Sequence, residues 1–165
     1  MAVISLKGNK VNTSGSLPAS GTKAPDFTLT GSDLGDVKLS DFKGKTVVLN
    51  IFPSIDTSVC AASVRKFNEI AGTKKGAAVL CISRDLPFAH ERFCSAEGLK
   101  NVTTLSEMKA LSFGEKYGLR IADGPLQGLL ARAVVVIDPE GKVKYTQLVP
   151  EITTEPDYDS ALKVL

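Results

Sequence analysis

Three short runs of apolar, mostly β-branched residues place the strongest constraint on how this chain folds. They occupy residues 46–52 (TVVLNIF), 77–83 (AAVLCIS) and 133–138 (AVVVID). In each run both alternating sets of side chains are largely apolar, which is typical of strands that are covered on both faces. Pro53 follows the first run and ends that strand, because proline cannot donate a hydrogen bond to a neighbouring strand. We therefore expect a central sheet with helices on two sides.

Helical patterns separate these strands. Residues 57–71 carry one apolar stripe that includes Cys60 and Phe67, and Gly72 is expected to end that helix. Similar patterns predict further helices at residues 87–97, 108–117 and 157–165, and a single helical turn at residues 40–42. Shorter strands are expected at residues 27–30, 37–39, 102–105 and 143–148.

The first sixteen residues alternate loosely around Gly8 and Asn9, which predicts a small β-hairpin with this pair in its turn. Residues 15–25 form a linker of Gly, Pro and Ser that is too short to separate two domains. Alternating buried strands and helices require parallel crossovers, and the last two strands add an antiparallel edge. The order predicts one α/β domain over residues 1–165. Its mixed sheet is flanked by helices in the thioredoxin-like manner, and the hairpin of residues 1–16 extends it.

The composition argues against several classes of function. The chain has 20 basic and 18 acidic residues without a block of like charge, so neither nucleic acid nor an acidic lipid surface is an expected partner. No apolar run approaches the roughly 18 residues that span a bilayer, and the N-terminus lacks the pattern of a secretory signal. We expect a cytoplasmic protein, with a processed periplasmic protein as the less favoured alternative. One histidine and three scattered cysteines lack paired ligand spacing, so neither a metal nor a cofactor is expected.

The chemistry is expected where strand 46–52 passes into helix 57–71. Cys60 lies there in the first turn of the helix, just beyond the carboxyl end of a central strand, where open α/β sheets bind ligands. Free backbone N–H groups and the helix dipole favour a thiolate over a thiol at this position. Thr57 is one helical turn earlier, so its hydroxyl is expected to point at the same sulfur. The ring of Pro53 is suited to shielding that sulfur from water.

These residues carry a family resemblance. Pro53-x-x-x-Thr57-x-x-Cys60 resembles the active-site motif of the peroxiredoxins. The longer run of residues 57–68 (TSVCAASVRKFN) is similar to the bacterial thiol peroxidase subfamily, the atypical two-cysteine peroxiredoxins. Further matching stretches cover residues 80–83, 85–89, 92–94, 122–126, 131–138 and 151–158, so that the resemblance extends over nearly the whole chain.

The resemblance implies a role for each matching residue. Cys60 corresponds to the cysteine that attacks a hydroperoxide, and Cys94 to the one that resolves the oxidised sulfur through an intramolecular disulfide. Thr57 and Pro53 correspond to the motif residues that line the pocket. Arg132 corresponds to the arginine beside the sulfur, where its charge would stabilise the thiolate and bind peroxide oxygens. The implied activity is a thioredoxin-dependent peroxidase of hydrogen peroxide and organic hydroperoxides in antioxidant defence, in a homodimer.

Plainer interpretations stand beside these roles. From the residues alone, Cys60 or Cys94 could be an inert core cysteine, and Arg132 an ordinary surface arginine. Cys81 lies inside the apolar run of residues 77–83, so it is interpreted as inert. His90, the only histidine, is interpreted as a half-exposed helix residue, with an effect on Cys94 as the alternative.

Two other functions remain open at this level. A protein thiol–disulfide oxidoreductase normally carries C-x-x-C at the helix start, but Ser63 occupies the second cysteine position here. A redox sensor that forms the Cys60–Cys94 bridge without turnover is the other. A disulfide requires Cα atoms within about 7 Å, so we expect local unfolding around residues 58–62 and 90–97 if the reduced fold holds the two helices further apart.

Overall fold

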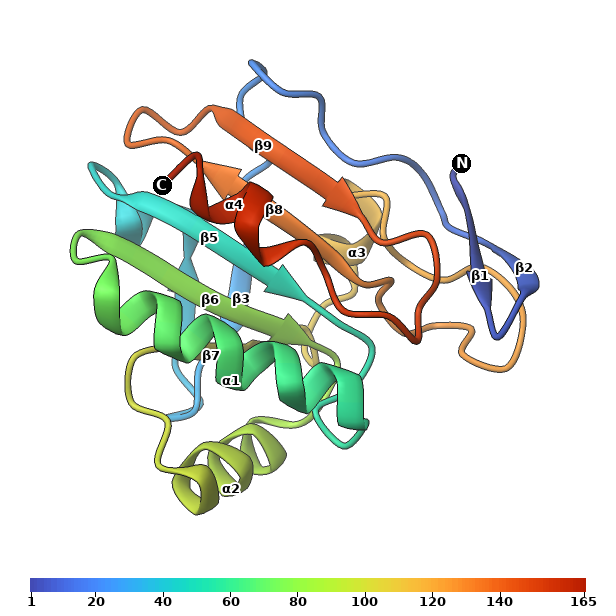
Figure 1. Cartoon of the computed structure of the whole chain (residues 1–165), viewed down its shortest axis with the longest axis horizontal. Helices are drawn as coiled ribbons and strands as arrows, with labels where there is room; N and C mark the ends of the chain where they lie inside the picture. Colours follow the sequence, from blue (N-terminus) through green and yellow to red (C-terminus); the bar gives the residue numbers. More distant parts are fainter.

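The computed structural model of the protein describes all residues 1–165 and contains a seven-stranded mixed sheet and a separate two-stranded hairpin. The strand order in the large sheet is β4-β3-β7-β6-β5-β8-β9 (Figure 1). The strands are β1 (Val3–Leu6), β2 (Asn9–Asn12), β3 (Thr28–Thr30), β4 (Asp36–Lys38), β5 (Thr46–Ile51), β6 (Ala77–Ser83), β7 (Thr103–Ser106), β8 (Ala133–Ile137) and β9 (Val143–Leu148). The helices are the 3-10 turn η1 (Leu39–Phe42), α1 (Ser58–Thr73), α2 (Pro87–Glu97), α3 (Ser112–Lys116) and α4 (Tyr158–Leu162).

The pairing of the central strands positions the site. β5, β6 and β7 are parallel, so their carboxyl ends meet at one edge of the sheet. β8 runs antiparallel beside β5, and Ala133 is paired with Ile51. The start of β8 and the end of β5 therefore lie next to each other, although more than 80 residues separate them in the chain.

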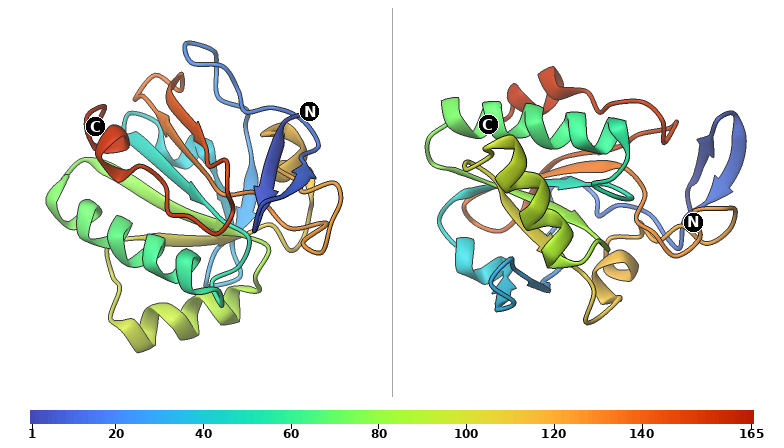
Figure 2. Two further views of the ribbon diagram at one scale, coloured as in Figure 1. Left: turned by 45° about the vertical axis from the view of Figure 1, so that its right-hand side comes forward. Right: turned by 90° about the horizontal axis from the view of Figure 1, so that it is seen from below.

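Each face of the sheet has its own apolar core, and helices lie on both faces (Figure 2). On one face Val48 of β5 packs in the same cluster as Phe67 of α1 and Phe93 of α2. On the other face Leu49 of β5 belongs to the cluster that contains Phe113 of α3. Alternate residues of one strand thus enter opposite cores, which is why the run needs apolar residues at nearly every position. The thioredoxin-like sheet and its N-terminal hairpin are confirmed.

Several element boundaries differ from the expected ones. α1 does not end at Gly72 but continues to Thr73. Gly72 has a packing role instead, because a Cβ atom there would approach the side-chain nitrogen of Asn101 to 2.9 Å. The pattern at residues 108–117 also predicted too long a helix, since α3 begins only at Ser112. Likewise α4 covers five residues rather than the whole of 157–165.

The turn of the N-terminal hairpin is one residue earlier than predicted. Lys7 and Gly8 form it, with φ angles of 51° and 81°, and Asn9 is already the first residue of β2. Two successive residues with positive φ are what a two-residue hairpin turn requires, and only glycine adopts this conformation without strain.

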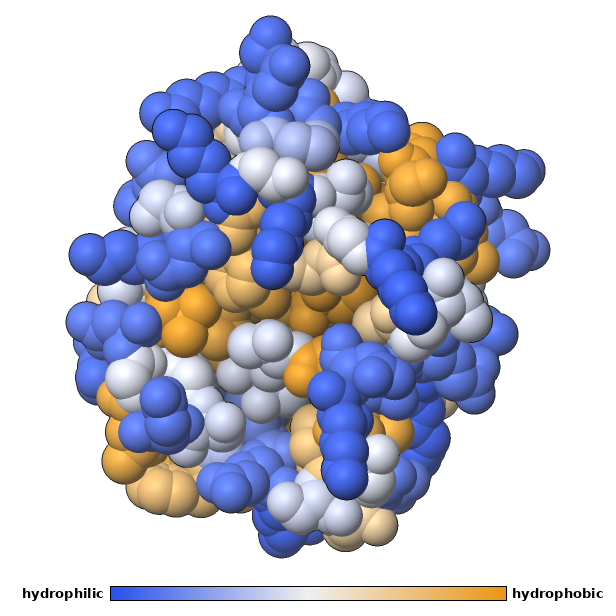
Figure 3. All heavy atoms as spheres, turned by 90° about the vertical axis from the view of Figure 1, so that its left-hand side faces the viewer, coloured by the Kyte–Doolittle hydropathy of each residue, from blue (hydrophilic) through white to orange (hydrophobic).

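Figure 3 shows the surface at the end of the sheet where β5 begins, opposite the carboxyl ends of the parallel strands. Hydrophilic side chains surround a strip of apolar atoms on this surface. A hollow of about 370 Å³ at this end is lined by apolar residues such as Phe42 and Val47, and by Lys43 and Lys45. It contains no cysteine.

None of the helices is both long enough and apolar enough to traverse a bilayer.

Candidate active site

Cys60 lies at the edge of the sheet where the parallel strands end. β5 stops at Ile51, a short loop follows, and Thr57 in an extended conformation is the N-cap of α1. Cys60 is the third residue of this sixteen-residue helix and is fully buried. Because the first N–H groups of a helix have no intrahelical acceptor, this position adds positive potential at the sulfur.

The guanidinium group of Arg132 contacts the sulfur of Cys60. The distance from Arg132 Nη2 to Cys60 Sγ is 3.4 Å. Arg132 immediately precedes β8, and the pairing of Ala133 with Ile51 brings it to the end of β5. Its side chain is among the largest buried ones in the protein. A buried cation at this distance stabilises a thiolate more than it would in water, because the surroundings have a low dielectric constant. The arginine is therefore not an ordinary surface residue.

A backbone carbonyl fixes the orientation of Arg132. Ile152 O accepts hydrogen bonds from Nε at 3.0 Å and from Nη2 at 2.8 Å, whereas the buried Nη1 has no partner in the protein. The segment that supplies this carbonyl is tied to the N-terminal hairpin, because Ile152 N donates to Ser5 O. The carboxylate of Glu151 also accepts from Ser5 Oγ and from the turn N–H groups of Lys7 and Gly8. The hairpin thus braces the arginine.

An open groove of about 720 Å³ is lined by Arg132, whose guanidinium group contacts the fully buried sulfur of Cys60. Pro53, Thr57 and Arg132 all line this groove. The other lining residues come from the hairpin, the start of α1, the 125–129 loop and the segment after β9: Leu6, Lys7, Asn9, Ser54, Ser58, Val59, Pro125, Leu126, Leu129, Ile152 and Thr153. One expected contact is absent, because the Thr57 hydroxyl donates to the carbonyl of Ser54 at 3.1 Å and not to the sulfur.

The two other cysteines have different surroundings. Cys94 is half-buried on α2, and burial raises the pKa of its thiol. Cys81 is fully buried in β6, and burial raises its pKa to about 12, so it stays a thiol at neutral pH. This agrees with its interpretation as inert. All three cysteines are free thiols in this structure. His, Cys, Asp and Glu side chains form no cluster of three that could hold a metal ion.

Ser63 stands where a protein thiol–disulfide oxidoreductase would carry its second cysteine. Its hydroxyl donates to the carbonyl of Cys60 at 2.8 Å, and Asn50 Nδ2 lies 3.2 Å from the same hydroxyl oxygen. Both side chains are buried. Ser63 therefore anchors the first turn of α1 to the sheet and offers no second thiol.

A polar cluster beside the site was not predicted from the sequence. Asp85, just after β6, accepts hydrogen bonds from Ser54 Oγ at 2.8 Å and from Ile55 N at 2.7 Å, and so holds the loop before α1. His90 of α2 is 1% exposed, with Nε2 2.8 Å from Ser83 Oγ and 3.7 Å from Asp85 Oδ2. The interpretation of His90 as half-exposed was wrong, because these partners at the end of β6 hold its ring inside the protein.

The carboxylate of Asp85 makes folding sensitive to acid. Burial alone would raise its pKa, but the surrounding donors outweigh burial and lower the pKa from 3.8 to about 2. A lowered folded-state pKa contributes stability that is complete above the unfolded value and is lost as the pH falls through the folded one. We expect Asp85 to account for about 2 kcal/mol of the stability lost between pH 5 and pH 2. Urea unfolding at a series of pH values checks this. Asp85→Asn should show a correspondingly shallower pH dependence, and an identical one would contradict it.

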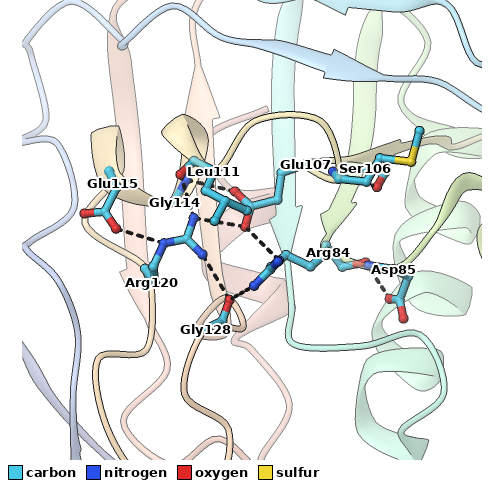
Figure 4. Close-up of polar contacts among 11 residues, drawn as sticks. Arg84, Asp85, Ser106, Glu107, Leu111, Gly114, Glu115, Arg120 and Gly128 are labelled. Carbon is cyan, nitrogen blue, oxygen red and sulfur yellow. Dashed lines mark hydrogen bonds and ion pairs between the residues drawn. The ribbon is translucent and has the colours of Figure 1, made fainter.

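A buried charge network supports the wall of the groove (Figure 4). The fully buried side chain of Glu107 is 3.3 Å from Arg120 Nη2 and 4.0 Å from Arg84 Nε. Both arginines also donate to the carbonyl of Gly128, Arg84 at 2.9 Å and Arg120 at 3.0 Å. Gly128 belongs to the loop that presents Leu126 and Leu129 to the groove. Burial raises the pKa of Glu107, so the two cations only partly offset the cost of burying its carboxylate. The network positions the loop rather than adding much stability.

The likeness to known proteins extends over the whole chain. The sequence profile of the Redoxin family matches residues 19–162. A thiol peroxidase of Mycobacterium tuberculosis is 60% identical over 165 residues, and one of Corynebacterium glutamicum is 56% identical over the same length; each alignment covers 100% of this chain and 99% of the relative. The crystal structure of a peroxiredoxin-like protein from Aquifex aeolicus superimposes with a TM-score of 0.93 at 43% identity, covering 99% of this chain and 95% of that one. The chain therefore belongs to the Redoxin family and, within it, to the thiol peroxidases of the peroxiredoxin type.

Proposed function

We propose that this protein reduces hydroperoxides with Cys60 as the attacking thiolate. The observation that carries the proposal is the contact of 3.4 Å between Arg132 Nη2 and Cys60 Sγ at the N-terminus of a long helix. The arginine and the helix dipole both favour the thiolate, which is the nucleophile for an O–O bond. The groove lined by Pro53 and Thr57 is the entry for the hydroperoxide, and its apolar residues suit organic as well as hydrogen peroxide.

The first step transfers one oxygen to sulfur. The Cys60 thiolate attacks the peroxide oxygen that carries hydrogen, an S–O bond forms, and the O–O bond breaks. The leaving alkoxide or hydroxide takes a proton from solvent water and departs as an alcohol or water, while Cys60 becomes a sulfenic acid. The buried Nη1 of Arg132 has no partner in the protein, so it is available to bind the oxygen that gains negative charge.

In the second step Cys94 resolves the sulfenic acid. Its sulfur attacks the Cys60 sulfur, the S–S bond forms, the S–O bond breaks, and the hydroxyl leaves as water with the proton of the Cys94 thiol. A thioredoxin-type dithiol then reduces the intramolecular disulfide by thiol–disulfide exchange and ends as a disulfide itself. We further propose a homodimer. The exposed side chains of Leu86 and Phe88, next to Asp85, support a protein contact near the site.

A stoichiometric peroxide assay tests this function. With thioredoxin, its reductase and NADPH, the native protein is expected to consume peroxide continuously. Cys94→Ser should consume one equivalent per chain and then stall, because the sulfenic acid has no resolving thiol, and dimedone should label Cys60 by mass spectrometry. Continuous turnover of Cys94→Ser at the native rate would contradict the role of Cys94. Reduction of insulin disulfides without peroxide would favour a protein oxidoreductase instead.

A further inference from the structure

The cluster at the end of β6 connects two segments that carry the two reactive cysteines. Asp85 holds Ser54 and Ile55 of the loop before α1, on the Cys60 side. Through Ser83 it reaches His90, which lies one helical turn before Cys94 on α2. The cluster is withdrawn from solvent, with His90 and Ser83 buried and the Asp85 side chain 11% exposed. None of the steps of the proposed reaction involves this cluster.

The hydrogen-bond directions in this cluster follow from its donors. A carboxylate only accepts, so the Ser83 hydroxyl donates its single proton to Asp85 Oδ2 at 2.5 Å. The nitrogen of His90 that faces Ser83 must therefore carry hydrogen and donate to the hydroxyl oxygen at 2.8 Å. This leaves Nδ1 of His90 buried without a partner. Only one of the two ring nitrogens of His90 therefore makes a hydrogen bond. This hydrogen bond, to Ser83, joins α2 to β6.

Two ion pairs also connect α2 to the Cys60 side, but both lie at the surface. Arg92 pairs with Asp56 at 2.7 Å, and both side chains are 63% exposed. Arg65 pairs with Glu97 at 2.9 Å, with 46% and 36% exposed. Exposed pairs of this kind add little to stability, because water screens them. The buried contact of His90 is the main polar connection that must break when α2 separates from this end of the sheet.

Cys60 is fully buried and lines no hollow, whereas Cys94 does, and both are free thiols, so we infer that one of the sulfurs must move before they can bond. The Cys60 sulfur contacts Arg132, and Arg132 lines the groove together with Pro53. Cys94 lines a separate hollow of about 430 Å³, together with Ser95, Leu99 and residues 102–104. Burial also raises the pKa of the Cys94 thiol. Release of α2 would therefore both free this sulfur to move and expose it to water, where it ionises more readily.

We propose that His90 and Asp85 are positioning residues. The bridge that they form through Ser83 holds α2 against the Cys60 loop while peroxide reacts, and the opening of this bridge releases Cys94 for disulfide formation. This inference rests on the proposed function, since it assigns the residues that control its second step. Opening is a local equilibrium of the reduced or sulfenic protein, so any loss of the bridge raises the population in which Cys94 can attack.

Two substitutions of His90 test the bridge. His90→Leu removes the donor to Ser83 but leaves no buried donor unsatisfied, because the Ser83 hydroxyl still donates to Asp85. His90→Gln keeps an amide donor within a side chain of comparable reach and serves as the control. In the reduced protein, amide hydrogen exchange over residues 90–97 should be about fivefold faster in His90→Leu than in the native protein, the factor that corresponds to one ordinary hydrogen bond. His90→Gln should remain close to the native rate.

Rapid-quench mass spectrometry gives the second readout. After one equivalent of peroxide, conversion of the Cys60 sulfenic acid to the disulfide should be about fivefold faster in His90→Leu, while the first reaction with peroxide keeps its native rate. Unchanged exchange and unchanged disulfide formation in His90→Leu would overturn the proposal, and so would equal acceleration in His90→Gln. If no variant reacted with peroxide, the proposed function would fail instead, and the exchange comparison, which needs no peroxide, would still show whether the bridge holds α2.

Discussion

Replacement of Cys60 by serine is expected to abolish peroxide reduction down to the uncatalysed background. A serine hydroxyl does not ionise near neutral pH, so even beside Arg132 it supplies no anionic nucleophile. The change replaces one buried atom in the first turn of α1 and keeps the hydrogen bond from Ser63 to the backbone carbonyl at residue 60. The fold should therefore persist. Peroxide consumption with thioredoxin, its reductase and NADPH measures the loss, and thermal unfolding verifies the fold.

Cys81→Ser is the matched control for this experiment. Burial raises the pKa of Cys81 to about 12, so it contributes no thiolate at neutral pH. Asn50 Nδ2 lies 3.7 Å from its sulfur and can donate to the new hydroxyl. Activity is expected to stay within about twofold of native, because the substitution changes one buried atom that does not line the groove. Native peroxide reduction by both Cys60→Ser and Cys81→Ser would show that neither sulfur is the nucleophile.

The central sheet could be predicted because burial on both faces leaves a direct mark on the sequence. β6 and β9 were predicted at their observed boundaries, and so was α2, where Pro87 lies in the first turn and Gly98 ends the helix with a φ of 67°. The end of α1 could not be predicted in the same way. Gly72 has no side chain because Asn101 of a distant loop packs closely against it, and a local sequence pattern does not reveal such a contact.

The site was predictable where its residues are neighbours in the chain or match the family motif. Cys60 and Thr57 follow directly from the end of β5, whereas the position of Arg132 depends on the pairing of Ala133 with Ile51, and its place beside the sulfur was implied only by the resemblance. The acceptor that orients Arg132 is a backbone carbonyl, and every residue has one, so no side-chain pattern reveals Ile152.

His90 shows why burial of a polar residue is difficult to predict. Its pattern on α2 permits a surface position, and its partners lie at the end of β6, before the helix begins. The residues Ser83, Asp85 and His90 are close in the chain, so the polar side chains just after a buried strand were the available signal. Only the packing of α2 beside the sheet turns that signal into a contact.

Arg132→Met is expected to lower kcat/KM for peroxide by about 10²- to 10³-fold, the loss typical of removing one preorganised donor from a reacting oxygen. Methionine keeps most of the buried volume but has no charge for the Cys60 thiolate and no donor for the peroxide. Arg132→Lys should be intermediate, because a single ammonium group cannot reproduce the planar set of donors that bonds Ile152 O and contacts the sulfur together. Alkylation of Cys60 by iodoacetamide at neutral pH should be slower in the methionine variant.

Arg65→Met is the control for a general loss of positive charge. Arg65 is 46% exposed and pairs with Glu97 at the surface, so its removal should change kcat/KM by less than about twofold. Thermal unfolding must show that Arg132→Met is folded, because the substitution removes the two hydrogen bonds that the carbonyl of Ile152 accepts from the guanidinium group. A native rate of peroxide reduction in a folded Arg132→Met protein would remove the physical basis for a stabilised thiolate at Cys60. Unchanged alkylation with slowed peroxide reduction would instead assign Arg132 to binding the peroxide oxygens alone.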